Sequence, residues 1–230
     1  MSTQNSTINS RFVFENASGM LADAGLNIQD SVLTQSDLIL EQQLSTTLQA
    51  YQFPVLNNTN GPSGSAFNTE VRLNQQDSFV ASAWGAFLLK AASPTDATFI
   101  VHTYPNPLTF TGAGVSAALE TIYNSYCKIT ANNQVILPVW HLSRHRSVPQ
   151  SQAIAADAGV YPGIAYDQID LSSDGFYPME PNVVFIGSKN YVIQVILPAA
   201  LTAVDTAGTT SDRLRLHYRG VLAQNSTIIT

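Results

Sequence analysis

The sequence predicts an all-β protein: a β-sandwich, jelly-roll-like in topology, with one short helix and an extended N-terminal arm. Short runs of β-branched and aromatic residues recur along the chain, separated by turns rich in Gly, Pro and Asn. Several runs are apolar at both alternating sets of positions, which is typical of strands covered on both faces. We therefore expect a single sandwich domain over residues 31–230, preceded by an arm over residues 1–30.

The composition narrows the function classes. Charged residues make up 11% of the 230 residues, less than half of the roughly 25% of a typical soluble domain. Ser, Thr, Asn and Gln take their place, as in capsid subunits, lectins and adhesins, and such a surface depends little on ion pairs. The net charge of −6 argues against the whole chain binding nucleic acid. The single cysteine, Cys127, is expected to be a small buried hydrophobic residue.

Targeting signals are not evident. The first ten residues are polar and no apolar run of the required length follows, so we expect no secretory signal. No uninterrupted apolar run approaches about 18 residues, so we expect no membrane span.

The N-terminal quarter contains the arm and one ambiguous segment. Residues 1–30 are polar and lack sustained periodicity. Residues 37–49 allow a helix, because three leucines recur at every fourth position. Alternation over residues 46–55 favours a strand that ends near Pro54.

Three further strands are predicted before the helix. Residues 67–73 alternate, residues 79–89 are apolar on both faces, and residues 98–104 form another run. Gly85, at the centre of the second run, indicates a bulge or a close backbone approach.

A helix and two hairpins are predicted next. Residues 112–126 have one apolar face, and we expect Ser116 to cap this helix. Residues 128–140 and 182–198 each contain two strand-like runs around a short polar turn, the pattern of a β-hairpin. Both faces of the second hairpin are largely apolar, so we expect other strands or another subunit to cover it.

The last predicted strand, residues 213–223, places basic side chains on one face and apolar side chains on the other. Basic residues also gather in residues 141–146. Two interpretations stay open: this basic face binds an anionic partner, such as a phosphate backbone or an acidic patch of a neighbouring subunit, or its arginines pair with carboxylates of the same chain. The candidate contact residues are Arg144, Arg146, Arg213, Arg215 and Arg219.

Aromatic residues supply a second set of candidates. Residues 150–179 show little strand pattern, and a predicted surface segment of this length commonly carries contacts. Rings in such segments stack on sugars, anchor protein interfaces, or cover the ends of the sandwich. The candidates are Tyr161, Tyr166 and Tyr177.

No catalytic or cofactor motif is present. The sequence lacks Gly-x-Ser-x-Gly, a glycine-rich phosphate loop, His-Glu-x-x-His and Cys-x-x-Cys. We expect no zinc site at His141 and His145, because an extended chain would separate them by about 13 Å. The acidic residues between positions 167 and 174 lack the spacing of a calcium loop. The sequence therefore predicts no enzyme, no cofactor and no metal.

Five short segments carry a resemblance to a known class of proteins. They are Asn68–Leu73, Gln76–Phe79, Tyr104–Pro107, Gly175–Pro178 and Arg219–Asn225. Together they resemble structural virion proteins of bacteriophages, over about residues 34–225. The resemblance implies a coat or auxiliary shell subunit that assembles with copies of itself and has no catalytic activity. The chain departs from a genome-condensing pattern, because it lacks a strongly basic N-terminal arm.

We therefore expect a virion structural protein, a self-assembling capsid subunit located in the virion after assembly in the host cytoplasm. Its expected partners are copies of itself and other virion proteins; contact with nucleic acid stays open, but not through a basic arm. The alternative is a carbohydrate-binding or adhesive β-sandwich module that uses the loop aromatics. A third class, a hydrolase, requires convergent carboxylates in a cleft.

Overall fold

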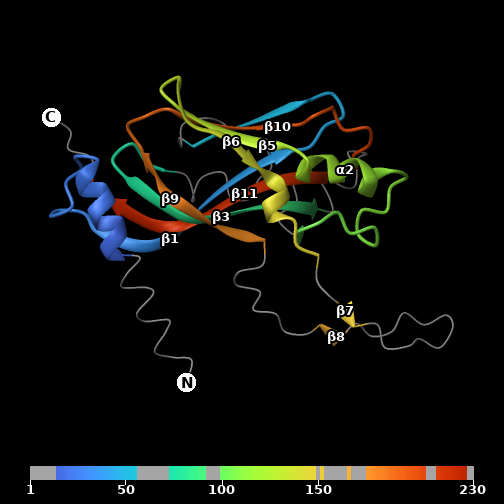
Figure 1. The fold of residues 1–230 in the computed structure, drawn as a ribbon, viewed down its shortest axis with the longest axis horizontal. Helices are drawn as coiled ribbons and strands as arrows, with labels where there is room; N and C mark the ends of the chain where they lie inside the picture. Colours follow the sequence, from blue (N-terminus) through green and yellow to red (C-terminus); the bar gives the residue numbers. More distant parts are fainter. Residues whose placement is uncertain are drawn as a thin grey trace.

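The computed structural model describes residues 14–55, 73–91, 99–148, 151–152, 165–166, 175–205 and 211–226. Two antiparallel sheets face each other (Figure 1), as predicted for an all-β sandwich. A helix over residues 14–23 lies at one end of the sandwich, and helix α2 (Val115–Tyr123) lies at the other (Figure 1).

The larger sheet has five strands in the order β1-β11-β3, with β4 and β9 both paired to the far side of β3. Its strands are β1 (Val32–Gln43), β3 (Ser78–Ala91), β4 (Phe99–His102), β9 (Phe176–Ile186) and β11 (Ser211–Gln224). The smaller sheet has the order β2-β10-β5-β6. Its strands are β2 (Ala50–Pro54), β5 (Tyr126–Ala131), β6 (Gln134–His141) and β10 (Tyr191–Ile196). Two short strands, β7 (Ser151–Gln152) and β8 (Ala165–Tyr166), pair with each other.

Alternating residues of the two sheets fill the core between them. Fully buried core residues of the central strands β10 and β11 include Ile193, Val195, Leu214, Leu216 and Tyr218. Each side chain of this size stabilises the fold by roughly 1.5–3 kcal/mol when it is buried. Cys127 of β5 lies in the same core, and burial raises the pKa of its thiol, as expected for a small buried hydrophobic residue.

The first predicted hairpin is confirmed. Strands β5 and β6 pair in an antiparallel manner, and Asn132 and Asn133 connect them with φ angles of 46° and 67°. Asparagine tolerates this left-handed conformation, which the favoured two-residue hairpin turn requires at both positions.

The second predicted hairpin is wrong in its pairing, although both strands exist. Strand β9 pairs with β3 in the larger sheet, whereas β10 pairs with β2 and β5 in the smaller one. The turn over residues 187–190 therefore crosses from one sheet to the other. Gly187 permits this crossing, because a Cβ atom there would lie 1.8 Å from the carbonyl oxygen of Asn74. Turn chemistry indicates a reversal of direction but not the partner of each strand.

The helical alternative for residues 37–49 is also wrong. Strand β1 occupies residues 32–43 and pairs with β11 along its whole length, while β2 confirms the strand expected near residues 46–55. Leu40 and Leu44 are buried, but Leu48 is 42% exposed. Long-range strand pairing overrides the local leucine spacing here.

The predicted helix is confirmed as α2, with a buried apolar face and a different N-terminus. Its N-cap is Gly114, which makes no side-chain cap, and Ser116 Oγ instead donates a hydrogen bond to the carbonyl oxygen of Pro105. Gly85 is a close backbone approach, as predicted: a Cβ atom there would lie 2.9 Å from the carbonyl oxygen of Gly175, and 2.5 Å from the ring of Phe87. The bulge lies elsewhere, because the register of β3 shifts between Ala81 and Ala83.

The expected arm contains ordered structure. Residues 14–23 form a helix whose Ala17 and Leu21 are buried against Val80 and Val221 of the larger sheet. Only two buried positions in ten residues make this periodicity too weak to recognise in the sequence. Strand β9 likewise begins at Phe176, inside the segment expected to be a long surface excursion. The predicted strand 67–73 lies outside the described residues except for Leu73.

Candidate functional site

A short 3-10 helix, η1 (Leu142–His145), follows β6 and places the ring of His145 in the core with no exposed surface. The indole Nε1 of Trp140 donates a hydrogen bond to its Nε2 at 3.0 Å, and its Nδ1 lies 3.1 Å from the carbonyl oxygen of Gly175. Because an indole nitrogen only donates, the ring proton of His145 is on Nδ1 and is donated to Gly175. Burial, opposed by this hydrogen bond, lowers the pKa of His145 to about 4. The ring is therefore neutral at pH 7.

Two buried rings support His145 from inside the sandwich. The centroid of the Trp84 ring lies 4.3 Å from that of His145 in an edge-on contact. Tyr218 stacks on Trp84 with 5.3 Å between centroids and 5° between planes, and neither ring is exposed. His145 thus ties the end of β6 to the start of β9 and rests on the central stack of the core. These contacts hold in place the residues that lie over His145.

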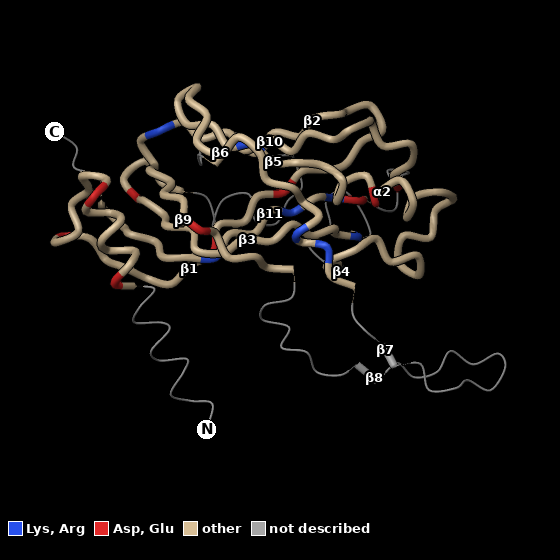
Figure 2. The backbone as a smooth tube through the Cα atoms, viewed as in Figure 1, with Lys and Arg blue, Asp and Glu red and all other residues tan. Residues whose placement is uncertain are grey.

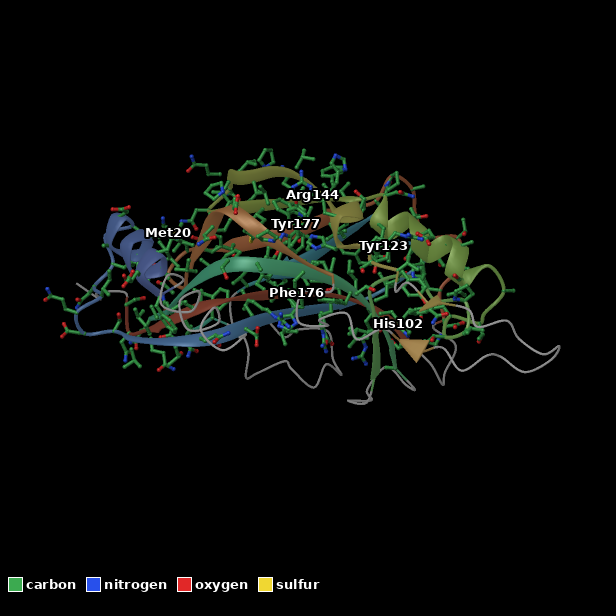
Figure 3. The ribbon with its side chains drawn as sticks, turned by 60° about the horizontal axis from the view of Figure 1, so that its bottom comes forward. Met20, His102, Tyr123, Arg144, Phe176 and Tyr177 are labelled. Carbon is green, nitrogen blue, oxygen red and sulfur yellow. The ribbon has the colours of Figure 1, made fainter. Side chains whose placement is uncertain are left out.

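The surface above His145 carries an aromatic–arginine cluster, which consists of Trp140, Arg144 and Tyr177. The Arg144 guanidinium lies 4.7 Å from the Trp140 ring centroid and 5.3 Å from that of Tyr177. The two rings meet edge to face at 5.6 Å. Tyr177 is 39% exposed, and Figure 3 shows it next to Arg144 at the surface. No carboxylate among the described residues lies within ion-pair distance of Arg144.

A groove of about 440 Å³ lies between the same two strands, β6 and β9. Ile136 of β6 lines one wall, and Pro181, Val183 and Val184 of β9 line another. Strand β6 is the edge of its sheet and contains no Asp, Glu, Lys or Arg, so it is uniformly tan in Figure 2. Its exposed apolar residues are Val135, Ile136 and Val139, which are 45%, 42% and 52% exposed. The cluster and the groove thus lie along one open side of the sandwich.

The basic strand face exists as predicted, but two of its three arginines, Arg213 and Arg215, pair with a carboxylate of the same chain. Arg213 and Arg215 are only 4% and 6% exposed. The Nε of Arg215 donates to Glu41 Oε1 at 2.8 Å, its Nη2 donates to the same oxygen, and Arg213 lies 3.6 Å from the other carboxylate oxygen. The register places Glu41 directly opposite Arg215 on β1. This geometry favours the second interpretation, in which the face is paired internally.

The remainder of that face is mixed aromatic and charged. His217 Nε2 lies 3.0 Å from Asp37 Oδ1, without meeting hydrogen-bond geometry. Burial lowers the pKa of His217 more than Asp37 raises it. The guanidinium of Arg219 lies 3.7 Å from the centroid of the Phe176 ring. Phe176 and Tyr177 are neighbours in β9 and therefore point to opposite sides of the strand (Figure 3).

Three further residues predicted from the sequence as contact candidates are Arg146, Tyr166 and Tyr161. Arg146 makes a two-pronged ion pair with Glu120 of α2, at 3.0 and 2.9 Å, in which both side chains are about 40% exposed. Tyr166 lies in β8, and Tyr161 lies outside the described residues, as does the acidic segment 167–174.

The pair His141 and His145 does not lie in an extended segment as expected, because η1 turns the chain between them. His141 is exposed, whereas both ring nitrogens of His145 are already hydrogen-bonded. Among the described residues, no group of three or more His, Cys, Asp or Glu side chains is placed to hold a metal ion.

Comparison of the chain with protein-family models, with curated proteins and with solved structures gave no match. No helix of the described part has the length and apolar character needed to span a membrane.

Sequence reasoning found Arg144 by its charge and Tyr177 by its ring, but it missed Trp140 and the buried position of His145. The hydrogen bond that joins the two strands spans 30 residues, from His145 to Gly175. A tryptophan five residues before a histidine was the only local signal, and it has no established structural meaning.

Proposed function

We propose that this chain is a virion structural protein, a self-assembling coat or auxiliary shell subunit without catalytic activity. The order of the strands is the observation that carries the proposal. Among the strands of the described residues, eight remain when β4, β7 and β8 are set aside, and they pair as nested hairpins: first with eighth, second with seventh, third with sixth, and fourth with fifth. The additional pairs, β11 with β3 and β10 with β5, divide this nested set into two sheets.

This nesting supports a jelly roll, an architecture of viral capsid subunits that lectin domains and cupins share. The fold alone does not select among these functions. The low charge, the resemblance to bacteriophage virion proteins and the apolar edge strand β6 favour the capsid subunit. Copies of a weakly charged chain can pack closely, because few like charges meet at each contact.

The test is assembly of the purified full-length chain at micromolar concentration. Light scattering coupled to size exclusion and negative-stain electron microscopy should reveal shells, rings or sheets. We expect this assembly to depend little on salt, because few charges contribute to it. A chain that remains strictly monomeric between low and high salt contradicts the proposal.

A carbohydrate-binding module is the second candidate, and the partly exposed rings of Trp140 and Tyr177 are the observation that favours it. Sugar rings stack on such aromatic faces. A change in tryptophan fluorescence on adding sugars, abolished by Tyr177→Ala, supports this candidate. A glycan array without binding, together with particles in the microscope, supports the shell subunit.

A further inference from the structure

A lysine–aspartate cluster, which consists of Lys90, Asp205 and Asp212, lies where β3 meets the start of β11. The register places Lys90 of β3 directly opposite Asp212 of β11. The amine Nζ of Lys90 donates one hydrogen bond to Asp205 Oδ2 and another, of 3.1 Å, to Asp212 Oδ1. The side chains of Lys90 and Asp212 are 12% and 0% exposed, and that of Asp205 is 25% exposed. One amine is therefore shared between two carboxyl groups in a nearly enclosed site.

The surrounding backbone holds the carboxyl group of Asp205 against this amine. Asp212 Oδ2 accepts a hydrogen bond of 2.8 Å from the backbone N–H of Asp205, and the backbone N–H of Asp212 donates to the carbonyl oxygen of Asp205 at 3.3 Å. A Cβ atom at Gly112 would lie 2.6 Å from Asp205 Oδ1, so only glycine leaves room for the carboxyl group. The buried ring of Phe110 covers the amine, with 5.6 Å between Nζ and the ring centroid. A nucleophile and a carboxyl carbon held in this way react far faster than the same groups in solution.

The charges of this cluster do not balance when all three groups are ionised, because two carboxylates then share one ammonium group. Burial raises the pKa of Asp212, although the N–H of Asp205 and the amine of Lys90 lower it. Asp212 therefore accepts a proton more readily than an exposed aspartate does, which is the property of a general base. A buried ion pair also retains a desolvation cost. An amide between Lys90 and Asp205 would remove both of their charges from the site.

We propose that Lys90 and Asp205 condense to an intramolecular amide, an isopeptide bond, and that Asp212 transfers the proton. The Lys90 ammonium first gives a proton to the Asp205 carboxylate, which leaves a neutral amine and a neutral carboxyl group. Nζ then attacks Cγ of Asp205, and Asp212 Oδ1 takes a proton from the nitrogen and returns it to the departing hydroxyl group. A C–N bond forms, a C–O bond breaks, and one water leaves on the exposed side of Asp205.

The reaction occurs once in each chain and requires no co-reactant, so it does not make the chain an enzyme. The bond would join two positions that are 115 residues apart, and a cross-link over a long loop restricts the unfolded chain strongly. A chain with one cysteine has no intrachain disulfide to supply such a restraint. The proposal goes beyond the shell function and holds whether or not the chain assembles.

The test is the mass of the denatured full-length chain, measured by intact mass spectrometry and followed by peptide mapping. We expect the folded and purified chain to be lighter than its sequence by the mass of one water. A protease digest should contain a branched peptide in which the side chains of Lys90 and Asp205 are joined. A chain of unreduced mass, whose digest contains both residues only in linear peptides, overturns the proposal. This result would leave the shell proposal intact, because assembly is measured separately by light scattering and microscopy.

Two variants control for other sources of water loss and for the identity of the acyl group. Lys90→Arg keeps the positive charge but supplies no amine, so this variant should have its full mass. Dehydration to a succinimide at the Asp-Gly sequence of residues 174–175 also removes one water, but it would persist in Lys90→Arg and would then overturn the proposal. Asp205→Asn presents a side-chain amide instead, so it should lose the mass of one ammonia.

The role of Asp212 is tested by the rate of bond formation after refolding from denaturant of chains purified in the unreacted state. Asp212→Asn keeps the size of the side chain but removes the base, so formation of the bond should be slower by roughly a hundred-fold or more. Circular dichroism checks that this variant has refolded. An Asp212→Asn chain that is folded and forms the bond as fast as the wild type contradicts the assignment of Asp212. If the variants fail to fold, the wild-type mass and its branched peptide decide the proposal alone.

Discussion

Arg215 and Arg144 are both arginines, but they differ in burial and in the groups that they contact. Arg215 is buried on the larger sheet, and Glu41 directly opposite accepts two of its hydrogen bonds. Arg144 is exposed and lies across two aromatic rings, without a carboxylate partner in the described part of the chain. A buried guanidinium without a counter-charge costs several kcal/mol, so Arg215 must be satisfied within the monomer. Arg144 carries no such requirement and is available to a partner.

The difference shows why a count of basic residues overestimates a binding surface. Both arginines belong to the clusters identified from sequence as candidates for an anionic partner. In the structure, burial separates them: Arg215 contributes to folding, while Arg144 remains at the surface beside Tyr177. The following variants test that separation through its effects on stability.

The largest effect is expected from Glu41→Ala. This change leaves Arg215 buried beside Arg213 without their shared carboxylate. Removing one partner of a buried pair typically costs about 3–5 kcal/mol of unfolding free energy, and urea denaturation measures it. The control, Glu120→Ala, breaks an exposed pair and should cost about 1 kcal/mol or less. If the two variants lose equal unfolding free energy, the buried pair of Glu41 contributes no more to stability than an exposed pair.

A smaller effect is expected from His145→Gln, and it concerns how the unfolding free energy changes with pH. In the wild-type chain the pKa of His145 is about 4 when folded and about 6.5 when unfolded. As the pH falls from 6.5 to 4, the unfolded state binds a proton that the folded state does not, so stability is lost across this window. The loss attributable to His145 is at most roughly 3 kcal/mol.

The variant with glutamine at position 145 does not titrate, so it should lose less stability on acidification than the wild type. His102 and His217 also have pKa values lowered by burial and contribute in the same direction, but they are common to both proteins. At pH 8 the variant is itself less stable, because Trp140 and Gly175 lose hydrogen bonds. The slope of unfolding free energy against pH is therefore the measurement, and identical slopes contradict a buried neutral His145.

Much of the fold could be predicted because its signals are local. The alternation in β11 placed Leu214 and Leu216 in the core, and Asn132-Asn133 located the first hairpin. The second hairpin failed for a physical reason: a four-residue turn reverses the chain equally well within a sheet and between two sheets. Which strand β9 joins is decided by burial against β3, which lies far earlier in the chain.

The candidate site was predictable only in part, for the same reason. Arg144 and Tyr177 stand out by residue type, but they meet only in the fold, where a hydrogen bond between His145 and Gly175 joins their two segments. The pairing of Arg215 with Glu41 spans 174 positions and depends on the register of β1 against β11. Residue type therefore supplied the candidates, and strand register decided which of them are internally paired.

The smallest effect on stability is expected from Arg144→Ala, which removes the exposed arginine. Cation–π contacts at exposed sites contribute about 0.5–1 kcal/mol, so this variant should lose about 1 kcal/mol of unfolding free energy, far less than Glu41→Ala. Its self-association, measured by sedimentation equilibrium, should nevertheless weaken, because the truncation removes an exposed guanidinium from the aromatic–arginine cluster. Glu41→Ala should show the opposite pattern, with a large loss of stability and unchanged association in the fraction that remains folded. If Arg144→Ala instead destabilises the monomer as strongly as Glu41→Ala, then Arg144 belongs to the folding machinery and the distinction between the two arginines is lost.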